Sequence, residues 1–263
     1  MANYTNTPFF IKLVFMITFS FHICSFIAQV GGETEFKDFK ITWSEDAAYF
    51  QNTFTGKRIK IYKNVDRDGY YLDDHLYDNH WVDSIKNIEH HTFKDSIALL
   101  TYSKEYVSSE LASVVGPYVS YIQNWYYEGG AHPTYGTQII VKSAQQVNSN
   151  LIDLFSEVDL FEALYNNEFV KKHLIDTNLR DLNDLWQNLD GGCDFYFGGV
   201  LENFAFHHLE QDHVALRIGV SYGCESMRGN FKQISILLPI PASLERWLLE
   251  ANQKKLLMCY LEK

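Results

Sequence analysis

The chain has 263 residues, of which 46% are hydrophobic and 16% aromatic. This is enough apolar side chain to bury a core, which excludes a disordered or fibrous protein. The 33 acidic residues outnumber the 22 basic residues, and the resulting net charge of −11 makes nucleic acid a poor partner.

The first 28 residues have the features of a secretory signal peptide. Lys12 precedes an uncharged apolar run over residues 13–28, and this run is short for a membrane span, which needs about 20 residues. We expect cleavage after Ala28 and export to the periplasm or the extracellular space, with an uncleaved N-terminal anchor as the alternative. Cys24 lacks the small preceding residue that lipidation requires. The chain from Gln29 onward carries 21 basic and 33 acidic residues, a net charge of −12, which favours a basic protein as partner.

Short strands are predicted at the start of the exported chain. Apolar residues alternate over 36–43 and again over 59–61, which is typical of half-buried strands. Residues 66–81 are rich in Asp, Tyr and His and show little periodicity, so we predict a long loop or a ragged edge strand there. The Gly and closing Glu of a calcium loop are absent at the required spacing, which favours a solvated acidic turn.

The next segment predicts two strands separated by a break. Residues 97–127 are rich in Val, Ile and Tyr and are interrupted only at Gly116 and Pro117. We place a soft boundary there, between a strand-rich region over 29–115 and an α+β domain over 116–263. A Gly-Gly-Ala-His-Pro turn then leads into a further strand over residues 137–142.

Helical spacing follows, and strands then return. Ser156 and Asp159 form a predicted N-terminal cap for one helix, a second helix is predicted over residues 179–189, and Pro241 opens a third. Alternating apolar residues predict strands at 214–220 and 234–238. The expected fold class is α+β, an antiparallel sheet with two to three helices packed on it.

Three cysteines follow the signal segment: Cys193, Cys224 and Cys259. In an oxidising compartment one pair can form a disulfide. Cys193 with Cys224 is the pairing to test first, because both lie in glycine-containing turns. No Cys-x-x-Cys spacing typical of a metal site is present.

Two local patterns suggest chemistry that their context does not support. Residues 219–223 match the G-x-S-x-G nucleophile pattern, but they lead toward another strand, and no Asp or His follows Ser221. Histidines and acids gather between His207 and His213 without the spacing of a zinc motif, and a polar hairpin turn explains them. We therefore expect no bound metal and no cofactor.

The turn around His132 is the strongest candidate for a binding site. His132 lies among glycines and tyrosines, where it serves either as a recognition residue or base, or as a side chain that holds the turn through the backbone. No acid or nucleophile pairs visibly with it in the sequence. The candidate binding residues are Tyr126, Tyr127, Gly129, Gly130, His132 and Tyr135.

The same turn carries a resemblance to a known family. Residues 125–133 read W-Y-Y-E-G-G-A-H-P and residues 150–155 read N-L-I-D-L-F. This resembles the GGAH … L-x-DLF signature of the RsiV-like extracytoplasmic domain family, shared with a lysozyme-sensing anti-sigma factor and some peptidoglycan deacetylases. Residues 203–244 are similar to the family's closing strands, with Ile240 where the family commonly has Tyr. The resemblance covers residues 95–250.

The resemblance implies a non-catalytic, exported binding protein. Its implied partner is a basic, lysozyme-like hydrolase or a cell-wall component such as peptidoglycan. The alternative is a hydrolase that acts on cell-wall or extracellular material through His132.

Overall fold

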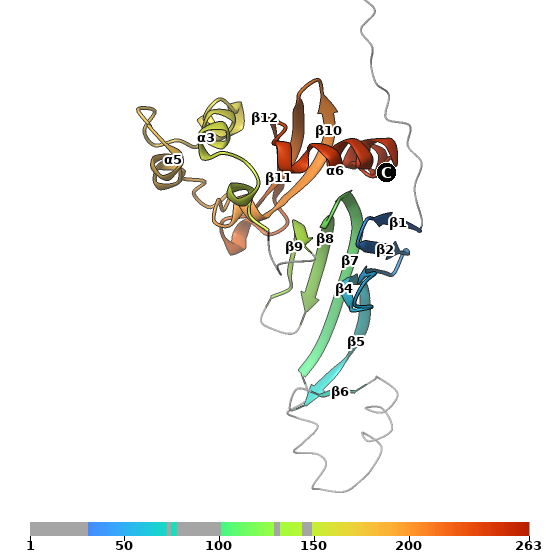
Figure 1. Ribbon diagram of the computed structural model, residues 1–263. Helices are drawn as coiled ribbons and strands as arrows, with labels where there is room; N and C mark the ends of the chain where they lie inside the picture. The colour runs from blue at the N-terminus through green and yellow to red at the C-terminus, as the bar shows by residue number, and fades with distance from the viewer. Residues whose placement is uncertain (1–30, 73–74, 78–100, 129–131, 144–148, 263) are drawn as a thin grey trace, which may run out of the picture.

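The computed structural model describes residues 31–72, 75–77, 101–128, 132–143 and 149–262 (Figure 1). Within this part of the chain, three antiparallel sheets and a few helices form an α+β fold, which confirms the predicted class. The predicted signal peptide lies outside the described residues.

The first sheet is a four-stranded meander in which each strand pairs with the next along the chain. Its inward side chains, Phe36, Ile41, Phe50 and Ile61, are each at most 4% exposed. The predicted 36–43 strand is divided between β1 and β2, and β3 was not predicted. The Lys142 ammonium of the second sheet donates a hydrogen bond to the carbonyl of Ile61 at 2.6 Å. The strands are β1 Gly32–Phe36, β2 Phe39–Trp43, β3 Ala47–Asn52 and β4 Arg58–Lys63.

The second sheet has five strands in the order β6-β5-β7-β8-β9. The segment 66–81, predicted as a long loop or a ragged edge strand, forms strands in its described part, and residues 73–74 and 78–81 lie outside the described residues. The short β6 lies at the edge and covers only residues 70–72 of β5, so within the described part of the chain residues 65–69 of β5 have a neighbouring strand on one side only. Pairing with β7 over residues 65–71 holds β5 in the sheet despite its weak apolar pattern. The strands are β5 Val65–Leu72, β6 His75–Tyr77, β7 Thr101–Val115, β8 Tyr118–Glu128 and β9 Thr134–Ser143.

Gly116 and Pro117 form the turn between β7 and β8, where the sequence predicts a break. Gly116 has φ +54°, and a Cβ there would lie 2.4 Å from Cδ2 of Trp247. Only glycine fits this turn without strain. The domain boundary predicted at residue 116 falls in this hairpin, and the five-stranded sheet contains strands from both sides of it.

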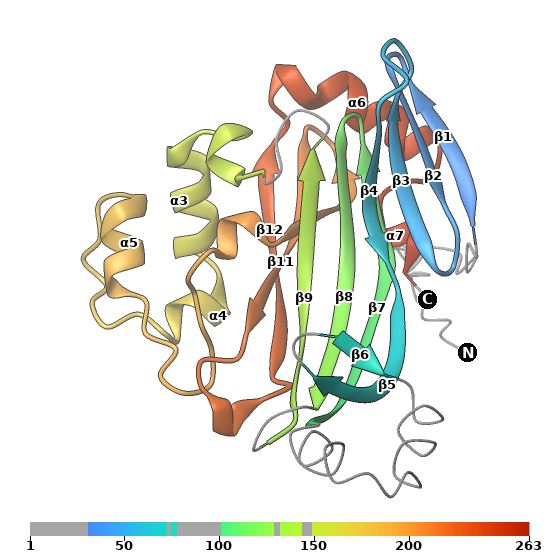
Figure 2. The ribbon, with the colours of Figure 1, turned by 90° about the horizontal axis from the view of Figure 1, so that it is seen from below.

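The third sheet, β10-β11-β12, packs on the five-stranded sheet, with β10 contacting β7, β8 and β9 (Figure 2). The backbone N–H of Phe206 donates to Oγ of Ser113 at 3.1 Å, and thereby joins β10 to β7. Both strands have a register shift at this point, which frees the N–H from the ladder. The strands are β10 Phe204–Glu210, β11 His213–Ser221 and β12 Phe231–Pro239.

Two groups of helices flank the sheets. In Figure 2, α3 lies beside β12 and α5 lies on the outer side of α3, whereas α6 and α7 pack against β7 and β10. The helices are α3 Glu157–Tyr165, α4 Glu168–Lys171, α5 Leu182–Asn188, α6 Ala242–Gln253 and α7 Met258–Leu261, with 3-10 turns η1 Leu151–Asp153, η2 Val200–Glu202 and η3 Glu225–Met227.

Local signals predicted the starts of two helices correctly. Ser156 caps α3 by accepting from the N–H of Asp159 at 3.1 Å, and Pro241 precedes α6, as predicted. The second helix is shorter than the predicted 179–189. Asp181 caps it before Leu182, and Leu189 leaves it to form a β-bridge with Leu174. Among the described residues, no helix has both the length and the apolar character needed to cross a membrane.

Candidate ligand-binding groove

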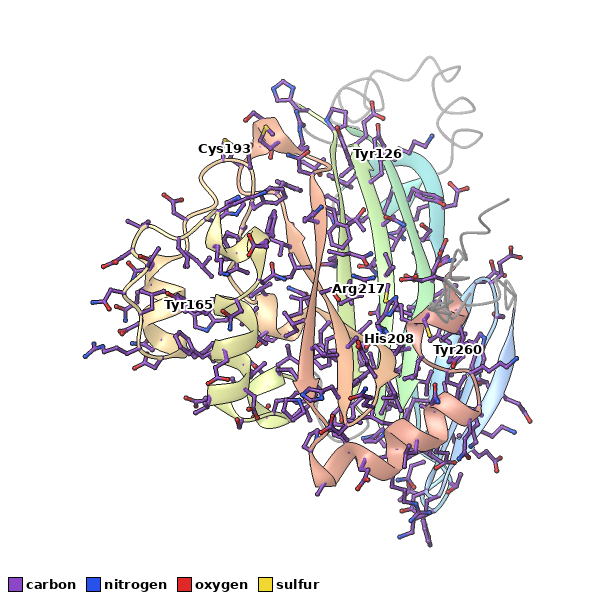
Figure 3. All side chains as sticks on the ribbon, turned by 90° about the horizontal axis from the view of Figure 1, so that it is seen from above. Tyr126, Tyr165, Cys193, His208, Arg217 and Tyr260 are labelled. Carbon is purple, nitrogen blue, oxygen red and sulfur yellow. A yellow bond between two sulfur atoms is a disulfide. The ribbon has the colours of Figure 1, made fainter. Side chains whose placement is uncertain are left out.

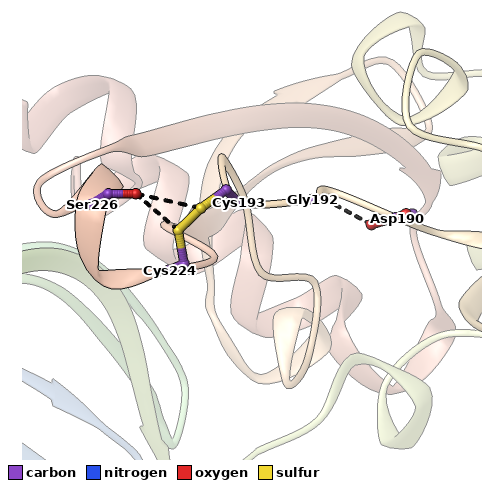
Figure 4. Close-up of a disulfide and its surroundings, with 5 residues drawn as sticks. All are labelled: Asp190, Gly192, Cys193, Cys224 and Ser226. Carbon is purple, nitrogen blue, oxygen red and sulfur yellow. Dashed lines mark hydrogen bonds between the residues drawn. A yellow bond between two sulfur atoms is a disulfide. The ribbon is translucent and has the colours of Figure 1, made fainter.

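A disulfide joins Cys193 to Cys224, across 31 residues of sequence (Figure 4). It is the pairing that the sequence singled out for testing. The carbonyl of Cys193 also accepts hydrogen bonds from the N–H groups of Gly223 at 3.2 Å and Cys224 at 3.0 Å. The loop over residues 190–199 is therefore fixed against the end of β11. Cys259 lies buried in α7.

Further hydrogen bonds connect this loop to the five-stranded sheet. The N–H of Tyr196 donates to the carbonyl of Ser221 at 2.8 Å. The hydroxyl of Ser221 in turn donates to the carbonyl of Thr137 on β9 at 3.2 Å. Ser221 thus bridges the loop and the edge strand β9, and the space between them has defined walls.

A groove of about 370 Å³ lies between β9, the 190–199 loop and the end of β11. This volume is in the usual range for small-molecule sites, roughly 300–1,000 Å³. Its side chains are aromatic, amide or hydroxyl, and its glycines leave space for the rings. The lining residues are Trp125, Gly136, Thr137, Gln138, Tyr196, Gly198, Asn203, Ser221 and Tyr222.

Two of the aromatic rings lie directly against glycines. Trp125 on β8 is opposite Gly136 on β9, and a Cβ at residue 136 would lie 2.8 Å from Cζ2 of the indole. Gly198 has the same relation to Tyr196, because a Cβ there would lie 2.1 Å from its hydroxyl oxygen. Tyr196 is nevertheless 62% exposed. The two glycines hold large rings in place while leaving surface free for a ligand.

The two amides of the groove each use their NH₂ group inside the protein. Gln138 donates to Oε1 of Gln123 at 3.1 Å, and Asn203 donates to the carbonyl of Gly199 at 2.9 Å. Among the described residues, neither amide oxygen accepts a hydrogen bond. Each therefore remains available to a ligand as an acceptor.

The tyrosines predicted from the sequence lie one rung further along the same hairpin. Tyr126 is directly opposite Tyr135, and Tyr127 is opposite Thr134. The hydroxyl of Tyr126 donates to Glu128 at 2.8 Å, and the ring of Tyr135 packs against Gly229. Tyr126 and Cys193 lie at the same end of the molecule (Figure 3). The predicted site and the groove are thus neighbours, but they share no residue.

His132 is exposed, at the end of the same hairpin. The guanidinium of Arg228 donates to the carbonyl of the adjacent Pro133 and pairs with Glu225 at 3.1 Å, which ties the turn to η3. Gly129 and Gly130 lie outside the described residues. The prediction for this turn therefore remains a prediction.

The two patterns that suggested chemistry have structural explanations. After Ser221 the chain passes through η3 into β12 and not into a helix, as the sequence predicts for residues 219–223. The hairpin turn predicted for the histidine cluster covers Glu210 to His213, but His207 and His208 lie inside β10, at its bulge, which corrects that prediction. Among the described residues, no three His, Cys, Asp or Glu side chains are grouped to hold a metal ion.

Sequence reasoning missed the residues that form the groove. Trp125 belongs to the motif quoted for the family resemblance but was not selected. Tyr196 lies in a Phe-Tyr-Phe run at residues 195–197, between the glycine pairs 191–192 and 198–199. This pattern was the one available signal for an exposed ring. No family model, no curated protein and no solved structure matches the chain.

Proposed function

We propose that this chain is an exported, non-catalytic binding protein that holds its ligand in the groove beside β9. The lining of the groove carries the proposal. Its aromatic, amide and hydroxyl side chains stack and form hydrogen bonds. None of these groups exchanges a proton readily near neutral pH, as a general acid or base must. Such a surface suits recognition better than hydrolysis.

Export is supported by two independent features. Disulfides persist in oxidising compartments, and the Cys193–Cys224 bond closes the loop that forms one wall of the groove. The uncharged apolar run at residues 13–28 has the character of a signal peptide. The proposed location is the periplasm or the extracellular space, and the proposed family is the RsiV-like domain family.

The partner follows from the resemblance and from charge. We propose a cell-wall component or a lysozyme-like hydrolase. The net charge of −12 after residue 28 would attract a basic enzyme, and that attraction weakens with salt.

Calorimetric titration tests the proposal. The purified protein is titrated with a panel of lysozymes and with soluble peptidoglycan fragments, at low and at moderate salt. We expect saturable binding of at least one class, with no product released from the fragments. Indifference to both classes would refute the proposal. Fragment cleavage that is lost in a His132→Ala protein would establish the hydrolase alternative instead.

A further inference from the structure

We infer that the groove binds a neutral pyranose sugar, packed against the rings of Trp125 and Tyr196. This inference rests on the proposed function and names the ligand class of the same site. It depends on three properties of the groove: its exposed aromatic surface, its mixture of hydrogen-bond donors and acceptors, and its lack of charge.

The aromatic surface matches the apolar face of a sugar. A pyranose ring presents C–H groups on its faces and hydroxyl groups around its rim. An aromatic ring attracts the C–H groups, which carry partial positive charge, because its own face carries partial negative charge. Tyr196 offers such a surface in a loop that the disulfide restrains, so little ordering is needed on binding.

The polar lining matches the rim of the sugar. Hydroxyl groups both donate and accept, and the groove offers both functions. The amide oxygens of Gln138 and Asn203 remain as acceptors. Trp125 and Tyr222, which also line the groove, carry an indole N–H and a hydroxyl as donors. A ligand with alternating hydroxyl groups satisfies both sets.

The lining also limits the charge of the ligand. Among the described residues that line the groove, none is Asp, Glu, Lys, Arg or His. A phosphate or carboxylate ligand would lack a cationic partner here, and a cationic ligand would lack a carboxylate, so each would lose hydration without compensation. A neutral, polyhydroxylated ring loses less hydration free energy on entering the groove.

A second hollow indicates that the ligand extends beyond one ring. It has a volume of about 520 Å³, shares Tyr196 and Gly198 with the groove, and includes Trp186, Asn150 and the exposed carboxylates of Asp190 and Glu202. The two hollows are thus adjacent, with Tyr196 in the wall of both. We therefore expect a trisaccharide to bind more tightly than the corresponding monosaccharide.

Calorimetry with defined saccharides tests the inference. The probes are N-acetylglucosamine, its β-1,4-linked trimer and cellotriose. Tyr196→Ala should weaken trimer binding about tenfold, the equivalent of one stacking contact. Gly198→Ala should weaken it similarly although the ring is retained, because the new methyl displaces that ring from its position. Phe54→Ala is the matched control, since Phe54 is an aromatic residue 82% exposed beyond β3, outside the groove.

The outcomes separate this inference from the proposed function. Trimer binding that falls in both groove variants and persists in Phe54→Ala supports both. Binding of a lysozyme without binding of any saccharide overturns the inference and leaves the proposed function standing. Trimer binding that Tyr196→Ala leaves unchanged overturns the assignment to this groove. Failure of every saccharide, lysozyme and peptidoglycan fragment overturns both.

Discussion

Ser113 and Ser120 form a cross-strand pair on β7 and β8 that isolates the effect of one buried hydrogen bond. They are directly opposite each other, and both are 0% exposed. Ser113 accepts a hydrogen bond from the N–H of Phe206, whereas the hydroxyl of Ser120 has no partner among the described residues. The same substitution at the two positions should therefore have opposite consequences.

Ser113→Ala leaves the N–H of Phe206 buried without an acceptor. The expected loss in the free energy of unfolding is about 1–3 kcal/mol, the penalty for one unsatisfied buried group. Ser120→Ala removes a hydroxyl that is already desolvated and unsatisfied, so it should be neutral or should stabilise by about 1 kcal/mol. The difference between the two variants is about 1–4 kcal/mol.

Urea unfolding measures both variants against the unchanged protein. Both changes delete the same atom. If the dependence of the unfolding free energy on urea concentration stays constant, the difference between the two urea midpoints therefore reports the contribution of the hydrogen bond. Equal destabilisation by both variants would show that volume alone matters at this position. A stabilising Ser113→Ala would refute the role of Ser113 as the link between the two sheets.

Three further predictions concern the backbone, the disulfide and pH. Gly116→Ala combines a positive φ with a clash and should lower the free energy of unfolding in urea by about 2–5 kcal/mol. Gly56→Ala, with φ +68° and no neighbour within 4 Å, should lower it by only about 1–2 kcal/mol. Replacing Cys193 and Cys224 by Ser should lower the free energy of unfolding by about 4 kcal/mol for this loop length. Burial raises the pKa of Tyr62 from 10.0 to about 12. The protonated hydroxyl therefore contributes fully to the free energy of unfolding below pH 10, and this contribution should fall as pH rises toward 12. Tyr62→Phe should reduce that decline in alkaline unfolding curves.

Much of the fold could be predicted because its signals are local. The alternation over residues 36–43 and 59–61 located β2 and β4, and Ser156 caps α3 with a side chain three residues from its partner. The errors arose where partners are distant in sequence. β5 has a weak apolar pattern and is held in the sheet by β7, about 35 residues further along the chain. Leu189 leaves α5 for a bridge to Leu174, which helical periodicity does not encode.

The groove could not be predicted from the sequence for the same reason. Its residues come from three segments, around 125–138, 196–203 and 221–222, and meet only when β9, the disulfide loop and β11 pack together. The tyrosine and histidine turn was easier to find because its residues are consecutive. It lies next to the groove, so the local signal selected the same end of the molecule but not the residues that enclose a volume.

Charge distribution distinguishes the two proposed partner classes. The chain after residue 28 has a net charge of −12, yet the described residues that line the groove carry no charged side chain. A neutral sugar held in the groove should bind with an affinity that changes little between low and moderate salt. A basic enzyme attracted by the acidic surface should bind more weakly as salt screens that attraction. If one protein binds both, the salt dependence of each affinity shows whether the groove or the acidic surface holds it.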